Sequence, residues 1–178
     1  MEKNRQGLLH IYCGDGKGKT SAAVGMAVRA AGCGMKVLVI RFLKTENSGE
    51  VEVLRSIPGI TVPPCERTFG FVFRMTEEQK QEAALYYQSR FEAAAKEAVQ
   101  EQYDLLILDE ILASCNYGMV RETSVVEFLQ NRPEKLEVVL TGRNPSETFL
   151  ELADYVSEIC MRRHPYEKGI PARRGIEF

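Results

Sequence analysis

The stretch Gly14-Asp15-Gly16-Lys17-Gly18-Lys19-Thr20 contains the residue types that bind a polyphosphate. Glycines let backbone N–H groups approach phosphate oxygens, Lys17 and Lys19 neutralise phosphate charge, and the Thr20 hydroxyl is a suitable ligand for Mg²⁺. The usual pattern G-x-x-x-x-G-K-[ST] requires glycine at position 13, where this chain has Cys13. The stretch is therefore a variant phosphate loop, and a glycine-rich turn without a ligand is the less favoured interpretation.

The acidic pair Asp109-Glu110 ends an apolar run that begins at residue 105. An apolar strand ending in acids is similar to the Walker B element, which holds a carboxylate near a phosphate-bound Mg²⁺. Many strands end in acids, so the pair is informative only together with the phosphate loop. We expect a metal site formed by Thr20, Glu110 and Asp109. The pair can also supply a general base for water, as in an ATPase.

Alternating apolar runs and helical patterns predict the elements that carry these motifs. Strands are expected at 8–13, 36–43, 60–62, 103–110, 137–141 and 155–161, and helices at 19–31, 51–57, 76–102, 123–130 and 144–153. Thr76 and Gln79 match a capping box at the start of the long helix. Asn144 is expected to cap the last helix, with Pro145 at its first position. Residues 63–75 are predicted as a loop, and the basic tail from 162 as irregular.

This order predicts an α/β fold: a three-layer, P-loop NTPase-like domain with a mostly parallel β-sheet covered by helices on both faces. No repeat or linker is visible, so residues 1–178 are expected to form one domain. Ligands of such sheets bind beyond the carboxyl ends of the strands, where the phosphate loop and the acidic pair both fall.

The composition excludes several classes of protein. The 178 residues are 44% hydrophobic and 27% charged with a formal net charge of −2, which argues against a nucleic-acid partner. No apolar run is long enough to span a membrane, and no secretory signal is visible at the start. The five cysteines are scattered without a CxxC pair, which predicts neither a zinc site nor a disulfide framework. Unpaired thiols favour a cytoplasmic location.

From Gly7 to Phe178 the chain resembles the P-loop type of the ATP:corrinoid adenosyltransferase family, whose phosphate loop also lacks the first Walker glycine. Outside that loop, the resemblance rests on short motifs along the chain and in its tail: Phe42-Leu43-Lys44, Leu108-Asp109-Glu110, Thr141-Gly142-Arg143, Ala153-Asp154-Tyr155-Val156-Ser157-Glu158, His164-Pro165-Tyr166, Gly169-Ile170, Ala172-Arg173 and Gly175-Ile176-Glu177-Phe178. The tail is the most specific part, because a generic kinase has no reason to carry it.

The resemblance implies that the 5′-deoxyadenosyl group of ATP is transferred to Co(I) of a corrinoid, with release of tripolyphosphate, in adenosylcobalamin synthesis or salvage. Lys17, Lys19 and Arg143 are then the expected catalytic residues, and Mg²⁺ the expected metal. Arg29 is a further candidate for nucleotide binding, with an ordinary helix-surface role about equally favoured. A flavoprotein reductant and a homodimer are also implied.

The family places aromatic residues against the lower face of the corrin, and the matching stretch here is Gly70-Phe71-Val72-Phe73. Phe71 and Phe73 are therefore candidate corrinoid-binding residues. Taken alone, the sequence favours another interpretation, in which Phe69, Phe71 and Phe73 are alternating core residues of an edge strand.

A phosphate loop does not by itself define a reaction. A phosphotransferase or ATPase is the first alternative, and a nucleotide-dependent switch without turnover is the second. The product separates them, because the first alternative gives ADP and phosphate whereas adenosyl transfer gives tripolyphosphate.

Overall fold

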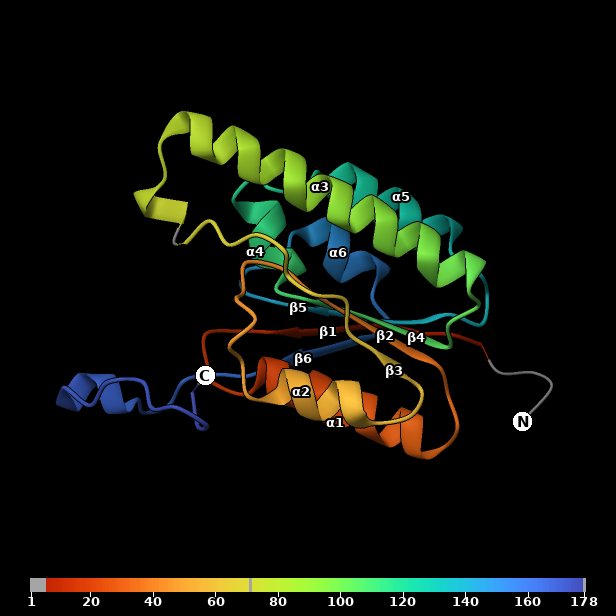
Figure 1. Cartoon of the computed structure of the whole chain (residues 1–178), viewed down its shortest axis with the longest axis horizontal. Coiled ribbons are helices and arrows are strands. Elements are labelled where there is room, and N and C mark those ends of the chain that lie inside the picture. Colours follow the sequence, from red (N-terminus) through yellow and green to blue (C-terminus); the bar gives the residue numbers. More distant parts are fainter. Residues whose placement is uncertain (1–5, 71, 178) are drawn as a thin grey trace.

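The computed structural model describes residues 6–70 and 72–177, in which a six-stranded parallel sheet lies between two layers of helices (Figure 1). The strand order is β3-β2-β4-β5-β1-β6, and every neighbouring pair is parallel. The expected α/β class is confirmed, and the sheet is more uniform than the expected mostly parallel one. The strands are β1 (Leu9–Cys13), β2 (Val37–Arg41), β3 (Ile60–Thr61), β4 (Leu105–Asp109), β5 (Glu137–Thr141) and β6 (Tyr155–Glu158).

Helices cover both faces of the sheet (Figure 1). One face carries α1 (Lys19–Gly32) and α2 (Glu50–Ser56), and the other carries α3 (Glu77–Gln100), α4 (Ile111–Asn116), α5 (Glu122–Asn131) and α6 (Glu147–Leu152). Successive side chains of a strand point to opposite faces, so one strand feeds two cores. In β2, Leu38 and Ile40 pack with the α3 side, whereas Val37 and Val39 pack with the α1 side.

Two helix starts test the local sequence signals. The capping box at Thr76 is confirmed, since its side chain accepts from the Gln79 N–H and the Gln79 side chain accepts from the Thr76 N–H. The assignment of Asn144 as a helix cap is wrong, because Ser146 caps α6 and accepts from the Phe149 N–H. Asn144 has a left-handed backbone (φ 49°), whereas a cap residue adopts an extended one, as Ser146 does.

Three short elements were not expected from the sequence. Helix α4 follows directly on the acidic pair and has six residues, too few for a helical period to be recognised. The 3₁₀ turns η1 (Val72–Arg74) and η2 (Pro165–Lys168) lie in the predicted loop and in the predicted irregular tail. Strand β6 ends at Glu158, three residues earlier than predicted.

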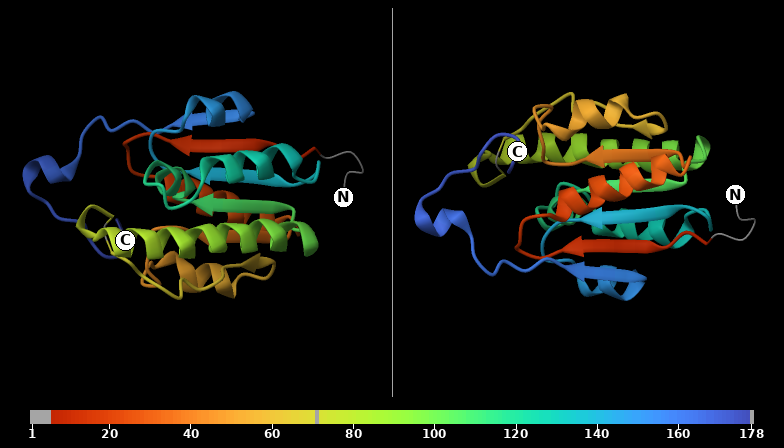
Figure 2. Two further views of the ribbon diagram at one scale, coloured as in Figure 1. Left: turned by 90° about the horizontal axis from the view of Figure 1, so that it is seen from above. Right: turned by 90° about the horizontal axis from the view of Figure 1, so that it is seen from below.

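The tail after β6 extends away from the sheet and then returns. Both views of Figure 2 show it leaving β6, passing through η2 and coming back to the end of the molecule where the loop between β1 and α1 lies. The tail therefore bounds the end of the sheet where ligands are expected. No helix in the described part of the chain has the length and hydropathy needed to cross a membrane.

Candidate active site

The phosphate loop connects β1 to α1, as predicted, and is backed by the first residues of the tail. The Gly16 N–H donates to the Ile159 carbonyl at 2.7 Å. A Cβ atom at Gly14 or Gly16 would lie 2.4 or 2.6 Å from that carbonyl oxygen, far inside van der Waals contact. Both glycines are therefore required by packing against the tail. Gly18 precedes α1 with φ 126°, a conformation that favours glycine.

Lys19 lies at the centre of this loop. Its Nζ donates to the carbonyls of Gly14 (2.9 Å) and Gly16 (2.8 Å), and the residue is 8% exposed. Burial lowers the pKa of its ammonium group, while the nearby charge of Glu110 opposes that shift. The loop thus holds a partly desolvated positive charge.

A cavity of about 240 Å³, here named the phosphate cavity, lies over the loop. Its walls include all the predicted loop residues from Asp15 to Thr20, together with Glu110 and Arg143. The Asp15 carboxylate accepts from the Met161 N–H, which lowers its pKa, so this side chain anchors the tail. The remaining walls come from Ser21 in α1 and from three residues of the tail, which lie in motifs on which the family resemblance rests: His164, Ile176 and Glu177.

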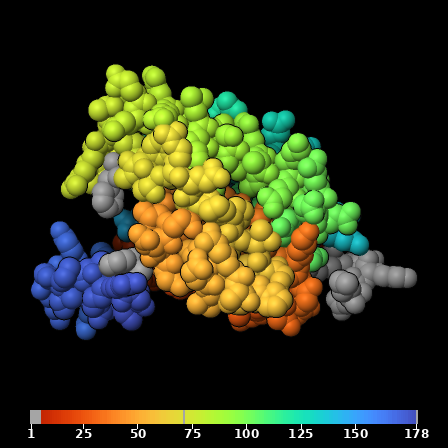
Figure 3. Space-filling model, viewed as in Figure 1, coloured from red at the N-terminus to blue at the C-terminus, as the bar shows by residue number. Residues whose placement is uncertain are grey.

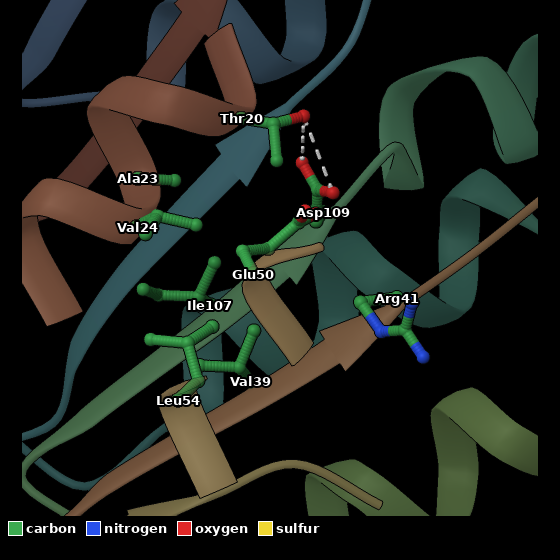
Figure 4. Close-up of a pocket in the computed structure, with 9 residues that line it drawn as sticks. All are labelled: Thr20, Ala23, Val24, Val39, Arg41, Glu50, Leu54, Ile107 and Asp109. Atoms are coloured by element: carbon green, nitrogen blue, oxygen red, sulfur yellow. Dashed lines mark hydrogen bonds between the residues drawn. The ribbon is translucent and has the colours of Figure 1, made fainter. Parts of the chain in front are cut away.

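The expected metal ligands Thr20 and Asp109 lie together. The Thr20 hydroxyl donates to both oxygens of Asp109, at 3.0 and 3.3 Å (Figure 4). Asp109 is 2% exposed, and its Oδ1 also accepts from the Thr141 hydroxyl at 2.6 Å. Lys44 Nζ lies 2.7 Å from Asp109 Oδ2 and 2.8 Å from Thr20 Oγ1. Sequence reasoning did not assign a site role to Lys44 or Thr141, although both lie in the quoted family motifs.

Glu110 lies beside this pair with a different geometry. Its backbone is left-handed (φ 62°) and precedes α4, and its N–H donates to the Thr141 hydroxyl at 2.9 Å. Burial raises the pKa of the Glu110 carboxyl, and the charge of Asp109 adds to the rise. Asp109 is therefore the carboxylate in contact with Thr20, whereas Glu110 lines the cavity next to it.

A second cavity of about 520 Å³, here named the aromatic cavity, shares Glu110 and Arg143 with the phosphate cavity. Its aromatic lining comes from Phe73 and Tyr117, both exposed. In the space-filling view, the segment around η1 and the tail lie on opposite sides of a recess at this end of the molecule (Figure 3). The other lining residues are Leu43, Lys44, Gly70, Val72, Ala113, Asn116 and Asn144.

Phe69 and Phe73 of the predicted loop do not share one face. Phe73 is 78% exposed in η1, so its assignment as a core residue of an edge strand is wrong. Phe69 packs against Tyr86 and Tyr87 at the margin of the core. Between them Gly70 has φ 76°, which breaks the extended alternation that the edge-strand interpretation requires. Phe71 lies outside the described residues.

Arg29 is separated from the other candidates. It is exposed in the last turn of α1, ten residues after Lys19 and so about 15 Å along the helix axis. It lines neither the phosphate cavity nor the aromatic cavity.

Strand, glycine-rich loop, buried lysine, helix and an acid at the end of β4 together define a P-loop-like domain of the α/β class. A solved structure of the EssC cytoplasmic domain has a similar fold, with a TM-score of 0.52 and 15% identity over 97% of this chain and 37% of that one. The model of the family described as ATP:corrinoid adenosyltransferase BtuR/CobO/CobP matches residues 5–178, and the chain belongs to that family.

Curated relatives carry the same activity in their names. The corrinoid adenosyltransferases of Pseudomonas aeruginosa and Escherichia coli K12 are each 32% identical over 177 residues, which is 99% of this chain and 86% and 88% of theirs. The corrinoid adenosyltransferase CobA of Salmonella typhimurium is 30% identical over the same length. The resemblance stated from the sequence is confirmed, and the chain is a transferase of the corrinoid adenosyltransferase class.

Proposed function

We propose that this enzyme transfers the 5′-deoxyadenosyl group of ATP to Co(I) of a corrinoid and releases intact tripolyphosphate, in the synthesis or salvage of adenosylcobalamin. The observation that carries the proposal is the wall shared by two cavities. Glu110 and Arg143 line both the phosphate cavity and the aromatic cavity, so a triphosphate in one can meet a large planar substrate in the other.

The chemistry requires position and charge more than proton transfer. Co(I) donates an electron pair to C5′, the bond between C5′ and its oxygen breaks, and the electron pair of that bond leaves with tripolyphosphate. Lys19, Lys17 and the loop N–H groups stabilise the charge that grows on the leaving group. Arg143 would stabilise the same charge from the wall that the two cavities share, since its Nη2 lies 3.5 Å from the carbonyl oxygen of Asp15 in the phosphate loop. Co(I) carries no proton, so no general base is needed.

The donor set at Thr20 and Asp109 fits Mg²⁺, because both supply hard oxygen ligands. An ammonium group lies against the same two oxygens, which indicates a place that favours a cation. No group of three or more His, Cys, Asp and Glu side chains suited to a metal occurs among residues 6–70 and 72–177, so nucleotide oxygens would supply further ligands. When bound, Mg²⁺ neutralises phosphate charge.

The aromatic cavity is the proposed corrinoid site. Phe73, and Phe71 by the family resemblance, would cover the lower face of the corrin and keep water from cobalt. A four-coordinate Co(II) is easier to reduce, which suits a flavoprotein donor. A homodimer and a cytoplasmic location complete the proposal; the five cysteines, all described, are free thiols.

The test is direct. The protein is mixed with ATP, Mg²⁺ and chemically reduced cobalamin, the visible spectrum is followed for a cobalt–carbon bond, and the phosphate products are separated. Adenosylcobalamin and tripolyphosphate in equal amounts are expected. ADP and phosphate without a spectral change would overturn the proposal in favour of a phosphotransferase or ATPase.

A further inference from the structure

The ammonium of Lys44 lies among the oxygens assigned above to the metal. Its Nζ is 2.8 Å from Thr20 Oγ1 and 2.7 Å from Asp109 Oδ2. Mg²⁺ approaches its oxygen ligands to about 2.0–2.1 Å, and a second cation on the same oxygens would be repelled. We propose that Lys44 is a positioning residue that takes the place of the metal: it holds Thr20 and Asp109 when no metal is bound and is displaced when Mg²⁺ arrives with ATP. The inference rests on the proposed use of magnesium-bound ATP.

Burial makes Asp109 depend on a cation. The carboxylate is 2% exposed, and an ionised group in such a place is costly without a counter-charge. The hydroxyls of Thr20 and Thr141 donate hydrogen bonds but bring no charge. Lys19 directs its ammonium to loop carbonyls, which leaves Lys44 as the cation in contact with Asp109 within the described ranges.

The backbone around Lys44 is anchored on both sides. On one side, the Phe42 N–H donates to the Asp109 carbonyl at 2.9 Å, and Leu43 adopts a left-handed conformation (φ 53°) that turns the chain. On the other, Arg41 donates to the Thr45 carbonyl at 2.8 Å and pairs with Glu46. Since the main chain is held, only the flexible four-carbon stem of Lys44 has to move.

Space for that movement is present. Lys44 lines the aromatic cavity and also a third cavity of about 860 Å³ beside α1, which ends at the tail. An ammonium that leaves Asp109 can therefore enter the aromatic cavity or this third cavity. The exchange of one cation for another keeps Asp109 compensated throughout.

The test measures ATP binding without corrinoid, so that no transfer occurs. Calorimetric titrations give the Kd for ATP with Mg²⁺ and with EDTA, for the wild type, Lys44→Met and Lys44→Gln. The quantity compared is the Kd for ATP in EDTA divided by the Kd for ATP with Mg²⁺. We expect this ratio to rise about five- to tenfold in Lys44→Met and Lys44→Gln, because both variants lose the substitute cation but keep the metal site. The second variant keeps a polar side chain, so that misfolding of the first leaves the proposal testable. Lys44→Arg, which keeps the charge, should restore the wild-type ratio.

Lys17→Met is the matched control, since Lys17 lines the phosphate cavity and makes no ion pair with Asp109 among the described contacts. Both of its Kd values should rise together, which leaves the ratio unchanged. A parallel rise in the Lys44 variants would make Lys44 an ordinary phosphate ligand and overturn the proposal, as would no change in either value. Adenosyl transfer by the wild type is assayed separately, so failure here does not touch the proposed reaction.

Discussion

The hydroxyl of Thr141 at the end of β5 donates to Oδ1 of Asp109 at the end of β4, over 2.6 Å, and the Thr141 hydroxyl oxygen accepts the Glu110 N–H at 2.9 Å. One side chain from a neighbouring strand thus fixes the carboxylate of the first acid and the backbone of the second. This arrangement explains how the chain can turn into a left-handed conformation at Glu110 directly after a buried carboxylate.

Replacing Thr141 by Val should destabilise the protein by about 1–3 kcal/mol, because the buried Asp109 carboxylate loses one of its donors and the Glu110 N–H loses its acceptor. Denaturant unfolding measures the loss. Thr123→Val, on the exposed surface of α5, makes the same chemical change and should stay within about 0.5 kcal/mol of the wild type. Equal losses in the two variants would contradict the role of Thr141.

Replacing Lys19 by Ala should lower the rate of adenosyl transfer by about a hundred- to thousandfold, because a preorganised donor to the leaving group is lost. Steady-state assays with pre-reduced cobalamin measure the effect, and circular dichroism checks the fold. The control is Lys96→Ala, which removes an exposed lysine of α3 and should keep the full rate. More than half of the wild-type rate in Lys19→Ala would remove Lys19 from the site.

The raised pKa of Glu110 predicts a pH-dependent gain in stability for Glu110→Gln. The folded protein binds the proton of the Glu110 carboxyl more tightly than the unfolded chain does. Ionisation of this carboxyl therefore lowers the stability of the fold as the pH rises above 4.5, the ordinary pKa of a glutamate. The glutamine variant should unfold at a higher temperature than the wild type at pH 8, and the difference should shrink as pH falls toward 4.5.

Glu151→Gln serves as the control for Glu110→Gln, because Glu151 is exposed on α6. It should follow the wild-type stability at every pH. A Glu110→Gln protein that is equally stable or less stable at pH 8 would show that burial does not strain the carboxylate.

The same variant, Glu110→Gln, should need more Mg²⁺ for half-maximal transfer, since a negative charge beside the metal site is removed.

Phe73→Ala should leave stability within about 0.5 kcal/mol, because the ring is 78% exposed. Transfer from pre-reduced Co(I) should change little, whereas transfer from Co(II) with a mild flavoprotein donor should fall about tenfold or more, about 1.4 kcal/mol in the barrier. The reason is that Co(II) keeps a lower ligand unless a ring excludes it. Leu85→Ala, equally exposed on α3, should affect neither assay. Parallel losses with both cobalt states would contradict the corrin-face role.

Local pattern was sufficient for much of the fold. The apolar runs and helical periods predicted all six strands and the longer helices, and Thr76 and Gln79 predicted the start of α3, because a capping box is satisfied within four residues. The Gly-Lys-Thr loop predicted the junction of β1 and α1, since its spacing must fit one turn between a strand and a helix. The prediction of Asn144 as the cap failed because its backbone is left-handed, whereas Ser146 has the extended backbone of a cap.

The arrangement of the site depended on tertiary structure. Thr20, Lys44, Asp109 and Thr141 come from four separate segments, and only the strand order brings them within hydrogen-bonding distance. The sequence indicated two carboxylates as metal ligands; the register of β4 and the left-handed turn after it decided which one contacts Thr20. The exposure of Phe73 and the position of the tail beside the phosphate loop were likewise decided by tertiary packing, because both depend on residues that are far apart in the chain.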